Sequence, residues 1–555
     1  MTQIDRNVTR RFITLATPFF KSEAKWRVWG LVALLLGLSL TLNSIGARMS
    51  YISRDFMTAL SLKNSELFFE KIWLYILAFM LVIPFSVSYM YIEQRLGLLW
   101  RRWLSHDILE RYFSNRAYYH LNLRGEIDNP DQRIEEDVRS FCSQTLMFAL
   151  ILFNSTVQLC LFTYVLWSIS WVLVLAAPIY ALLGSVVTYF LGRPLVGLNF
   201  LQFKKEADYR YKLINVRDSA ESIAFYRHEN REFTRTRQRL KIALDNSLNV
   251  INWNRNLRFF TEGYNYLSPL IPTILVAPLF FRGEIELGVV YQAGGAFGAV
   301  TTALSIVVNK FFDLSVFAAV TNRLGSFCEA MERCSEPLSA GERISVVKGN
   351  HLELKHVTIW TPRREQVLIK DISFAFKSTS LLISGPSGSG KSSLLRVIAG
   401  LWDTGSGEII RPDLDNALFI PQRPYMILGS LRSQLIYGTK RKGILDRELF
   451  DVLERVKLTE MAHRVGGLDA ILDWPNVLGT GEQQRLAFAR IFLIKPQIVF
   501  LDESTTAIDS ASERQLYSEL PRFVERYVST GSPQDLETYH EHVLELTGDG
   551  TWRYR

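Results

Sequence analysis

The residues best suited to chemistry in this sequence form one glycine-rich turn. The turn consists of Gly385, Pro386, Ser387, Gly388, Ser389, Gly390, Lys391 and Ser392, and Ser393 follows it directly. An apolar, strand-like run at 381–383 precedes the turn, and a helix-like run at 393–399 comes next. Backbone N–H groups in such a turn can point inward and cradle phosphates, and the helix N-terminus adds positive potential. The pattern predicts a nucleotide site in which Lys391 reaches the β- and γ-phosphates and Ser392 ligates Mg²⁺.

Two acidic residues, Asp502 and Glu503, end a second apolar run at 498–501. Such a run predicts a buried parallel strand that delivers both carboxylates to the phosphates. We expect Asp502 to hold Mg²⁺ through water and Glu503 to polarise the attacking water. An apolar strand that ends in acids is common, but downstream of the phosphate-cradling turn it becomes a strong indication of a nucleotide hydrolase.

Three further motifs resemble those of ABC ATPases. The stretch 478–485, which contains Gly479, Thr480, Gly481 and Glu482, resembles their signature sequence, Gln422 resembles their Q-loop, and the stretch 506–509 resembles their D-loop. The resemblance implies that Gln422 joins the Mg²⁺ site and that the signature of one subunit closes over the phosphate turn of another. A functional dimer with two composite ATP sites is therefore expected. Glycine at 481 would permit close backbone approach, and the helix that starts near Glu482 would aim its N-terminus at a phosphate.

The sequence departs from this family at two positions. Gly479 stands where the signature usually has a serine, and Ser532 stands where a switch histidine is expected, since His540 and His542 lie too far along the chain. Loss of one donor to the transferred phosphoryl group costs about 2.7–4 kcal/mol of transition-state stabilisation by analogy with oxyanion holes. Hydrolysis is therefore expected to be slow, with the Ser532 hydroxyl compensating in part.

Adenine recognition has one aromatic candidate, Trp360. It precedes the first turn of the nucleotide domain and could stack on the base. It could equally be a core residue at the edge of a sheet, and both interpretations stay open.

The elements that position these residues divide between lipid and water. Of the 555 residues 48% are hydrophobic, and the mean hydropathy is +0.08. A membrane-spanning helix takes about 20 residues. Six apolar runs are long enough, at 28–47, 72–92, 146–168, 171–192, 264–281 and 287–308. The fifth contains Pro269, Pro272 and Pro278, where we expect kinks.

The net charge of +8 has two possible meanings, nucleic acid binding or a membrane protein with basic cytoplasmic loops. The arginines gather in the N-terminal tail and in the loops 94–142 and 193–262, next to the spans. This distribution favours the membrane, excludes a nucleic-acid partner and places the N-terminus and the nucleotide domain in the cytoplasm. The four cysteines have neither the spacing of a zinc site nor that of a disulfide framework.

Within the long loops, Leu96, Trp100, Leu104, Ile108 and Tyr112 form an i, i+4 row. The row predicts that the second span continues as a helix into the cytosol with one packed face. We expect a membrane domain at 1–333, a linker at 334–350 and the nucleotide domain at 351–555.

Two loop motifs resemble those of peroxisomal D-subfamily ABC half-transporters and their bacterial homologues that import cobalamin and peptides. The motifs are the stretch 129–134 with Asp137, and the stretch 220–226. The resemblance implies six membrane helices of the type IV exporter kind and a homodimer that moves an acyl-CoA or fatty acid, cobalamin or a peptide. Whether the loops couple the two domains or simply pack stays open, and we expect a bacterial cytoplasmic membrane.

A different class of protein also fits. The departures at Gly479 and Ser532 are compatible with a nucleotide-gated channel or a regulatory membrane protein whose ATPase is degenerate. In the sixth span we expect Lys310 and Asp313 to pair with each other. Gly294, Gly295 and Gly298 would allow close helix approach there, and a role in a substrate cavity is the alternative.

Overall fold

The computed structural model describes residues 6–125, 127–335, 343–532 and 536–555 and has two compact units, 1–335 and 336–555. Part of the predicted linker at 334–350 belongs to regular structure instead. The last helix of the first unit runs to Ser335, and Ser345–Lys348 forms strand β1. β1 pairs in parallel with β5 (Gly405–Arg411), so its backbone bonds to a distant strand rather than to water. Residues 336–342 of the predicted linker lie outside the described residues.

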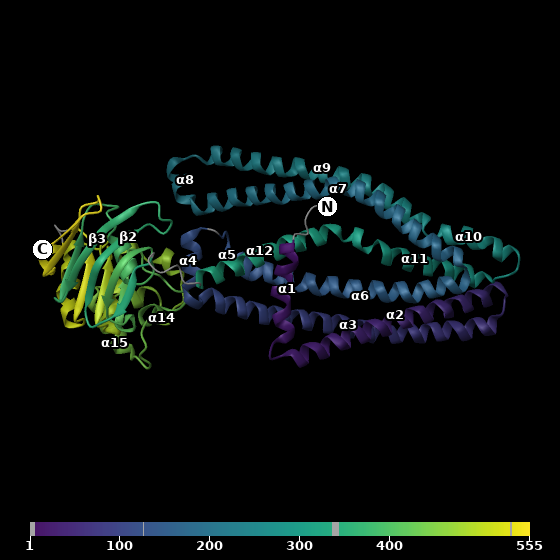
Figure 1. Ribbon diagram of the computed structural model, residues 1–555, viewed down its shortest axis with the longest axis horizontal. Coiled ribbons are helices and arrows are strands. Elements are labelled where there is room, and N and C mark those ends of the chain that lie inside the picture. Colours follow the sequence, from purple (N-terminus) through teal and green to yellow (C-terminus); the bar gives the residue numbers. More distant parts are fainter. Residues whose placement is uncertain (1–5, 126, 336–342, 533–535) are drawn as a thin grey trace. The chain divides into compact units, whose positions relative to one another are not determined.

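The first unit is helical throughout its described residues (Figure 1). Its helices are α1 (Arg6–Lys21), α2 (Lys25–Ser61), α3 (Ser65–Phe113), α4 (Ala117–Arg124), α5 (Pro130–Gln132), α6 (Val138–Ile169), α7 (Trp171–Asp218), α8 (Ala220–Tyr226), α9 (Glu229–Leu267), α10 (Leu270–Phe281), α11 (Leu287–Asn309) and α12 (Phe311–Ser335). Among the described residues, six helical segments are long and apolar enough to cross a membrane, namely α2, α3, α6, α7, α9 with α10, and α11. Each predicted span lies within one of them, so the six spans are confirmed.

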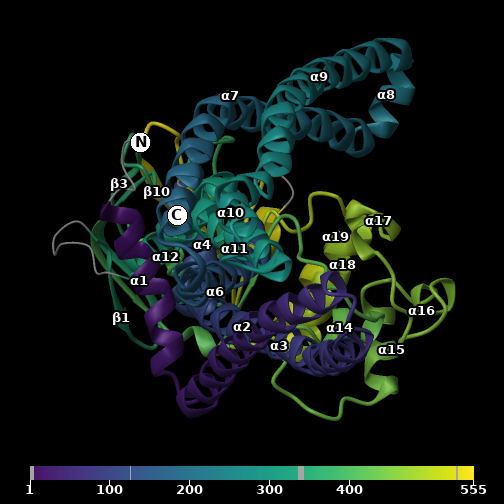
Figure 2. The same ribbon diagram turned by 90° about the vertical axis from the view of Figure 1, so that its right-hand side faces the viewer.

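The membrane helices extend well beyond the apolar runs. α3 has 49 residues, and the predicted row is confirmed because Leu96, Trp100, Leu104 and Ile108 are buried along it. α7 and α9 lie side by side and are joined at their tip by α8 (Figures 1 and 2). α6 and α7 are separated by a single residue, Ser170, whose hydroxyl accepts from the backbone N–H of the second residue of α7. Long rigid helices therefore carry the loop motifs away from the spans.

Proline interrupts the fifth span at one place. α9 ends at Leu267 and α10 begins at Leu270, so Ser268 and Pro269 separate the two helices. Pro269 has no N–H to donate to a helical partner, which accounts for the interruption. Pro278 lies inside α10, whose helix continues through it.

Of the two roles predicted for three glycines in the sixth span, close helix approach is not found at these positions of the described chain. A Cβ atom added to Gly294, Gly295 or Gly298 would meet nothing within 4 Å. Close helix approach occurs elsewhere: a Cβ on Gly288 of α11 would overlap the carbonyl oxygen of Arg54 in α2. The expected pair of Lys310 and Asp313 is confirmed, with 2.9 Å between Nζ and Oδ2.

The second unit is built on two sheets. One has the strand order β10-β9-β4-β8-β7-β6, and neighbours in it run parallel except β10 and β9. The other has the order β1-β5-β2-β3. The remaining strands are β2 (Leu352–Trp360), β3 (Val367–Phe376), β4 (Ser380–Ser384), β6 (Ala417–Ile420), β7 (Ile498–Asp502), β8 (Arg526–Thr530), β9 (His542–Leu546) and β10 (Trp552–Tyr554). The helices are α13 (Lys391–Ile398), α14 (Leu431–Ile436), α15 (Asp446–Arg455), α16 (Met461–Arg464), α17 (Trp474–Val477), α18 (Thr480–Ile494) and α19 (Ser510–Glu519).

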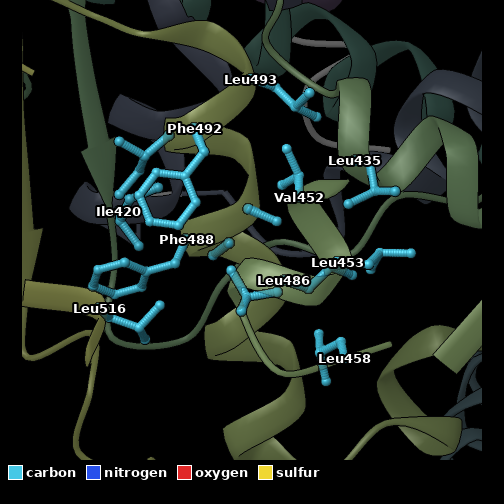
Figure 3. Packing of buried hydrophobic residues seen from close by; sticks show 14 of the residues in the cluster. Ile420, Leu435, Val452, Leu453, Leu458, Leu486, Phe488, Phe492, Leu493 and Leu516 are labelled. Carbon is cyan, nitrogen blue, oxygen red and sulfur yellow. The ribbon is translucent and has the colours of Figure 1, made fainter. Parts of the chain in front are cut away.

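The core of this unit lies around α18. Phe488 and Phe492 are buried with Leu453 of α15 and Leu516 of α19 (Figure 3). Burial of each such side chain contributes about 1.5–3 kcal/mol, which fixes α18 against its neighbours. The predicted fold class, six membrane helices followed by an α/β domain, is confirmed.

Candidate functional site

Three neighbouring strands bring the predicted chemistry to one edge of the large sheet. β4 leads into the glycine-rich turn, β7 ends at Asp502, and β8 ends at Thr530. β8 lies between β4 and β7, and all three run parallel. The carboxyl ends of parallel strands are where α/β sheets bind ligands.

The turn itself has the geometry of a phosphate cradle. Gly385, Gly388 and Gly390 have φ values of 141°, 82° and 99°, which only glycine adopts without strain. α13 begins at Lys391, two residues before the predicted start. The Lys391 side chain is buried, and its Nζ donates to the carbonyl oxygens of Gly385 (2.9 Å) and Pro386 (3.1 Å). A buried ammonium folded back onto its own turn is placed to exchange these neutral acceptors for a phosphate.

An orphaned hydroxyl supports the fit of a phosphate. Ser389 Oγ is buried within the turn and has no hydrogen-bond partner in the described part of the chain. A buried polar atom without a partner costs about 1–3 kcal/mol. A phosphate oxygen in the cradle would satisfy it.

The oxygen atoms expected to hold Mg²⁺ lie together. Ser392 Oγ donates to Asp502 Oδ1 at 2.8 Å, which joins the turn to the end of β7. Gln422 Nε2 donates to Glu503 Oε2 at 3.0 Å, and Lys391 Nζ lies 3.7 Å from Glu503 Oε1. Hydroxyl, carboxylate and amide oxygens are the ligands that Mg²⁺ prefers, so these residues fit the ion.

Thr530 joins this site without having been predicted. Its side chain is 1% exposed; Oγ1 donates to Asp502 Oδ1 at 2.9 Å and accepts from the Glu503 N–H at 2.9 Å. Glu503 has a φ of 45°, so the threonine holds both carboxylate residues where the backbone turns out of β7. Its position at the end of a strand, just before Gly531 and Ser532, is the signal that could have identified it.

The signature stretch begins α18. Gly479 is its N-cap, and the Gly479 N–H donates to Glu482 Oε2 at 3.1 Å. A hydrogen bond from Arg464 keeps the pKa of the Glu482 carboxyl below its ordinary value. A Cβ on Gly481 would overlap the carbonyl oxygen of Ala507, so the close approach that this glycine permits is to the D-loop of its own chain. The Gly479 position, by contrast, has open space.

Gln484 lies within the signature stretch and connects it to two loops of the site, contacts that the sequence did not predict. It is 1% exposed, and its Oε1 accepts from the Ala507 N–H at 3.0 Å. Its Nε2 donates to the Gln422 carbonyl oxygen at 3.1 Å and lies 3.4 Å from Thr506 Oγ1. One buried amide thus holds the signature helix, the Q-loop and the D-loop in register.

Replacing Gln484 with leucine is expected to lower the free energy of unfolding of the second unit. It removes the side-chain partners of two backbone groups, the Ala507 N–H and the Gln422 carbonyl, and each lost hydrogen bond costs about 0.5–1.5 kcal/mol. ATP turnover should fall while nucleotide retention by the turn persists. Thermal unfolding and ATPase assays of the purified chain measure both. Gln483→Leu is the matched control, because among the described residues the Gln483 side chain donates to the nearby carbonyls of Pro475 and Leu478. Equal effects of the two variants would contradict this role.

The histidine nearest the site faces away from it. His540 Nε2 lies 2.9 Å from Ser529 Oγ, and Nδ1 lies 2.8 Å from the Leu536 carbonyl oxygen. Ser529 and Thr530 are consecutive in β8, so their side chains point to opposite faces of the sheet. Ser532 follows the end of β8 at the phosphate edge, and its side chain is exposed. Ser532 therefore occupies the expected position of the switch residue, and its role stays a prediction.

Acidification should destabilise the second unit through His540. Burial lowers the pKa of this imidazole to about 4 from an ordinary 6.5. The unfolded chain therefore binds the proton first, and stability is lost as the pH falls through 6.5 toward 4. Between about pH 7.5 and pH 5 the loss is about 2 kcal/mol. Thermal unfolding of His540→Gln should show a flatter pH dependence than the wild type, whereas His542→Gln should not; parallel curves for His540→Gln and wild type would refute this origin.

Trp360 ends β2 with 36% of its surface exposed and pairs with Val367 of β3. Half-buried aromatic residues at a sheet edge can serve either as adenine platforms or as core residues. Both interpretations therefore stay predictions.

The loop motif at 129–134 is held within the first unit by ion pairs and hydrogen bonds. Arg133 donates to Asp128 Oδ1 at 2.6 Å and to the Arg323 carbonyl oxygen of α12 at 2.8 Å. Buried Asp137 accepts from the Arg323 guanidinium. The motif thus fixes the segment between α3 and α6 to α12, the last helix of its unit. The second motif forms α8, where Phe225 and Tyr226 are exposed.

The fold and the site define an integral membrane protein that carries a P-loop ATPase domain. A family model described as ABC transporter transmembrane region 2 matches residues 15–281, and one described as ABC transporter matches residues 369–506. An uncharacterised ABC transporter ATP-binding protein of Synechocystis is 42% identical, covering 96% of this chain and 82% of its own length. The chain belongs to the ABC transporter family.

Two further relatives confirm the predicted resemblance to the D subfamily. ABC transporter D family member 2, chloroplastic, of Arabidopsis thaliana is 37% identical over 98% of this chain and 86% of its own length. The human lysosomal cobalamin transporter ABCD4 is 32% identical over 99% of this chain and 96% of its own length. A solved bacterial Atm1-family ABC exporter with ATP bound superposes with a TM-score of 0.70 at 17% identity, covering 95% of both chains, and supports the fold. Family membership supports nucleotide binding and ATP-driven transport.

Proposed function

We propose that two copies of this chain form a transporter in which binding and hydrolysis of Mg·ATP drive a solute across a membrane. The observation that carries the proposal is the phosphate cradle at 385–392 in the same chain as six membrane-spanning helices. A ligand shifts a conformational equilibrium only by its differential affinity for the two states. ATP supplies that difference if it binds the closed pair of nucleotide domains more tightly than the separated pair.

In this proposal the turn residues bind the phosphates. Lys391 exchanges its carbonyl acceptors for the β- and γ-phosphates, and the glycines and Ser389 supply donors from the backbone and side chain. Ser392, Asp502 and Gln422 would hold Mg²⁺. When bound, this ion neutralises charge on the phosphate oxygens. Its ligands are already joined by the Ser392–Asp502 hydrogen bond.

Glu503 is the proposed general base. Its carboxylate is held by Gln422 on one oxygen, and Lys391 approaches the other. A carboxylate anchored in this way can orient a water molecule and accept its proton. Ser532 at the same sheet edge would donate a hydrogen bond to the transferred phosphoryl group.

The second subunit completes each site. Gly479, Thr480, Gly481 and Glu482 of one copy would cover the phosphates held by the other, with the N-terminus of α18 contributing positive potential. Thr480 opens that helix and is exposed, as a contact with a partner requires. Trp360 would stack on the adenine.

The solute is proposed to be an acyl-CoA or fatty acid, cobalamin or a peptide, since one relative is named a cobalamin transporter. The membrane is proposed to be the cytoplasmic membrane of a bacterium. The arginine-rich loops support a cytoplasmic N-terminus and a cytoplasmic nucleotide domain.

A second candidate is a nucleotide-gated channel, which Gly479 and Ser532 favour. Purified protein in liposomes separates the two functions when ATPase activity and solute flux are measured together. Steady turnover with ATP-dependent flux, both lost in Lys391→Ala, is expected of the transporter. Flux without turnover would contradict it and favour the channel.

A further inference from the structure

A polar cavity of about 290 Å³ opens between the junction of α9 with α10 and one face of α11. Its lining residues are uncharged, and most carry a hydroxyl or amide group or are glycine. They are Tyr264, Asn265, Ser268, Pro269, Gly294, Gly298, Thr301, Thr302 and Ser305. All belong to the fifth and sixth membrane segments, where polar groups are expensive and mark functional sites.

The cavity exists because two features leave space. Ser268 and Pro269 break the regular helical hydrogen bonding between α9 and α10 on one wall, although their φ and ψ angles stay helical. On the opposite wall Gly294 and Gly298 lie one turn apart, and a Cβ on either would meet nothing within 4 Å. These glycines therefore do not serve helix packing; they keep the cavity open.

The α9 wall is held in place from behind. The Tyr264 ring stacks on Tyr180 of α7 with 4.2 Å between centroids. The Tyr180 hydroxyl donates to the Tyr264 carbonyl oxygen, and a Cβ on Gly184 would overlap the Tyr264 ring. The ring has little freedom to collapse into the cavity, so the space is a preformed feature of this unit.

We infer that this cavity binds a neutral, hydrogen-bonding part of the transported solute, such as an amide, carbonyl or hydroxyl group. The inference rests on the proposed transport function. Hydroxyl and amide side chains both donate and accept hydrogen bonds, which suits uncharged polar groups. An anionic group placed here would meet no cation among the lining residues, and an unpaired buried charge is far more costly than a neutral dipole.

Filling the cavity tests the inference. Gly298→Leu puts a side chain into open space, and Thr302→Val removes one hydroxyl at constant shape. Gly37→Leu in α2 is the matched control, since a Cβ there also meets nothing within 4 Å and Gly37 does not line the cavity. Binding to the detergent-purified full chain is measured by titration with cyanocobalamin, an uncharged blocked tetrapeptide and palmitoyl-CoA.

At least one of the three probes should bind the wild type and Gly37→Leu alike, with Kd raised at least tenfold in Gly298→Leu and severalfold in Thr302→Val. Palmitoyl-CoA also qualifies, because its pantetheine arm carries two neutral amides and a hydroxyl. Unchanged Kd values in both cavity variants would overturn the inference, as would no binding of any of the three probes to the wild type. Retention of Mg·ATP is measured on the same samples. If the wild type fails to retain it, the proposed transport function falls, whatever the cavity binds.

Discussion

Replacing Glu503 with glutamine is expected to slow ATP turnover by about 10²- to 10⁴-fold, the usual contribution of a general base. The amide keeps the size of the side chain and can still accept from Gln422, but it cannot take a proton from water. Nucleotide retention should remain, because the phosphate cradle at 385–392 is untouched. Single-turnover hydrolysis of radiolabelled ATP by the purified chain measures the first quantity, and filter retention measures the second.

The control for this substitution is Glu460→Gln, which makes the same chemical change at an exposed residue outside the site. It should leave both quantities as in the wild type. Hydrolysis by Glu503→Gln within a few-fold of the wild type would show that the carboxylate does not act as the base.

Introducing serine at Gly479 is expected to raise ATP turnover about 100-fold. ABC ATPases usually carry a serine donor here, and a single donor to a transition-state oxyanion contributes about 2.7–4 kcal/mol. The position accepts a side chain, since a Cβ meets nothing within 4 Å. Adding Ser532→His should increase turnover further, because the Ser532 side chain is exposed and has room to be replaced. Steady-state ATPase rates of the purified dimer measure the gain.

Gly479→Ala provides the matched control, because it adds the Cβ without the hydroxyl. It should leave turnover near the wild-type rate. A gain equal to that of Gly479→Ser would mean that added side-chain volume at this N-cap, and not a donor hydroxyl, raises the rate.

Contiguous patterns predicted most of the site and all six spans. The glycine-rich turn, Asp502 and Glu503 each lie next to the strand or helix that positions them, so local spacing was sufficient. The spans could also be predicted from local sequence. A run of about 20 apolar residues is enough to identify a membrane-spanning helix, whatever helices lie next to it.

Residues that depend on distant neighbours were missed. Thr530 joins the site because β8 lies between β4 and β7. The order of strands in a sheet cannot be predicted from any single segment of the sequence. Gln484 gains its role from loops that end up around one buried amide. The face of Gly294 and Gly298 was expected to pack closely, but the interruption at Ser268 leaves a cavity beside it. The sequence predicts a linker where β1 lies. This strand is short, and its pairing with the distant β5 leaves no local pattern.

In the proposed transporter, nucleotide bound in the cradle at 385–392 changes the arrangement of the membrane helices of the same chain. This coupling is tested most directly by the rate at which N-ethylmaleimide labels Thr302→Cys in the cavity, with and without Mg·ATP. Cys160 and Cys334 are first replaced by serine, while buried Cys142 and Cys328 are retained. We expect a severalfold change in labelling rate on adding Mg·ATP, and no change when Lys391→Ala is also present. Identical labelling rates with and without Mg·ATP in the protein that retains Lys391 would contradict this coupling.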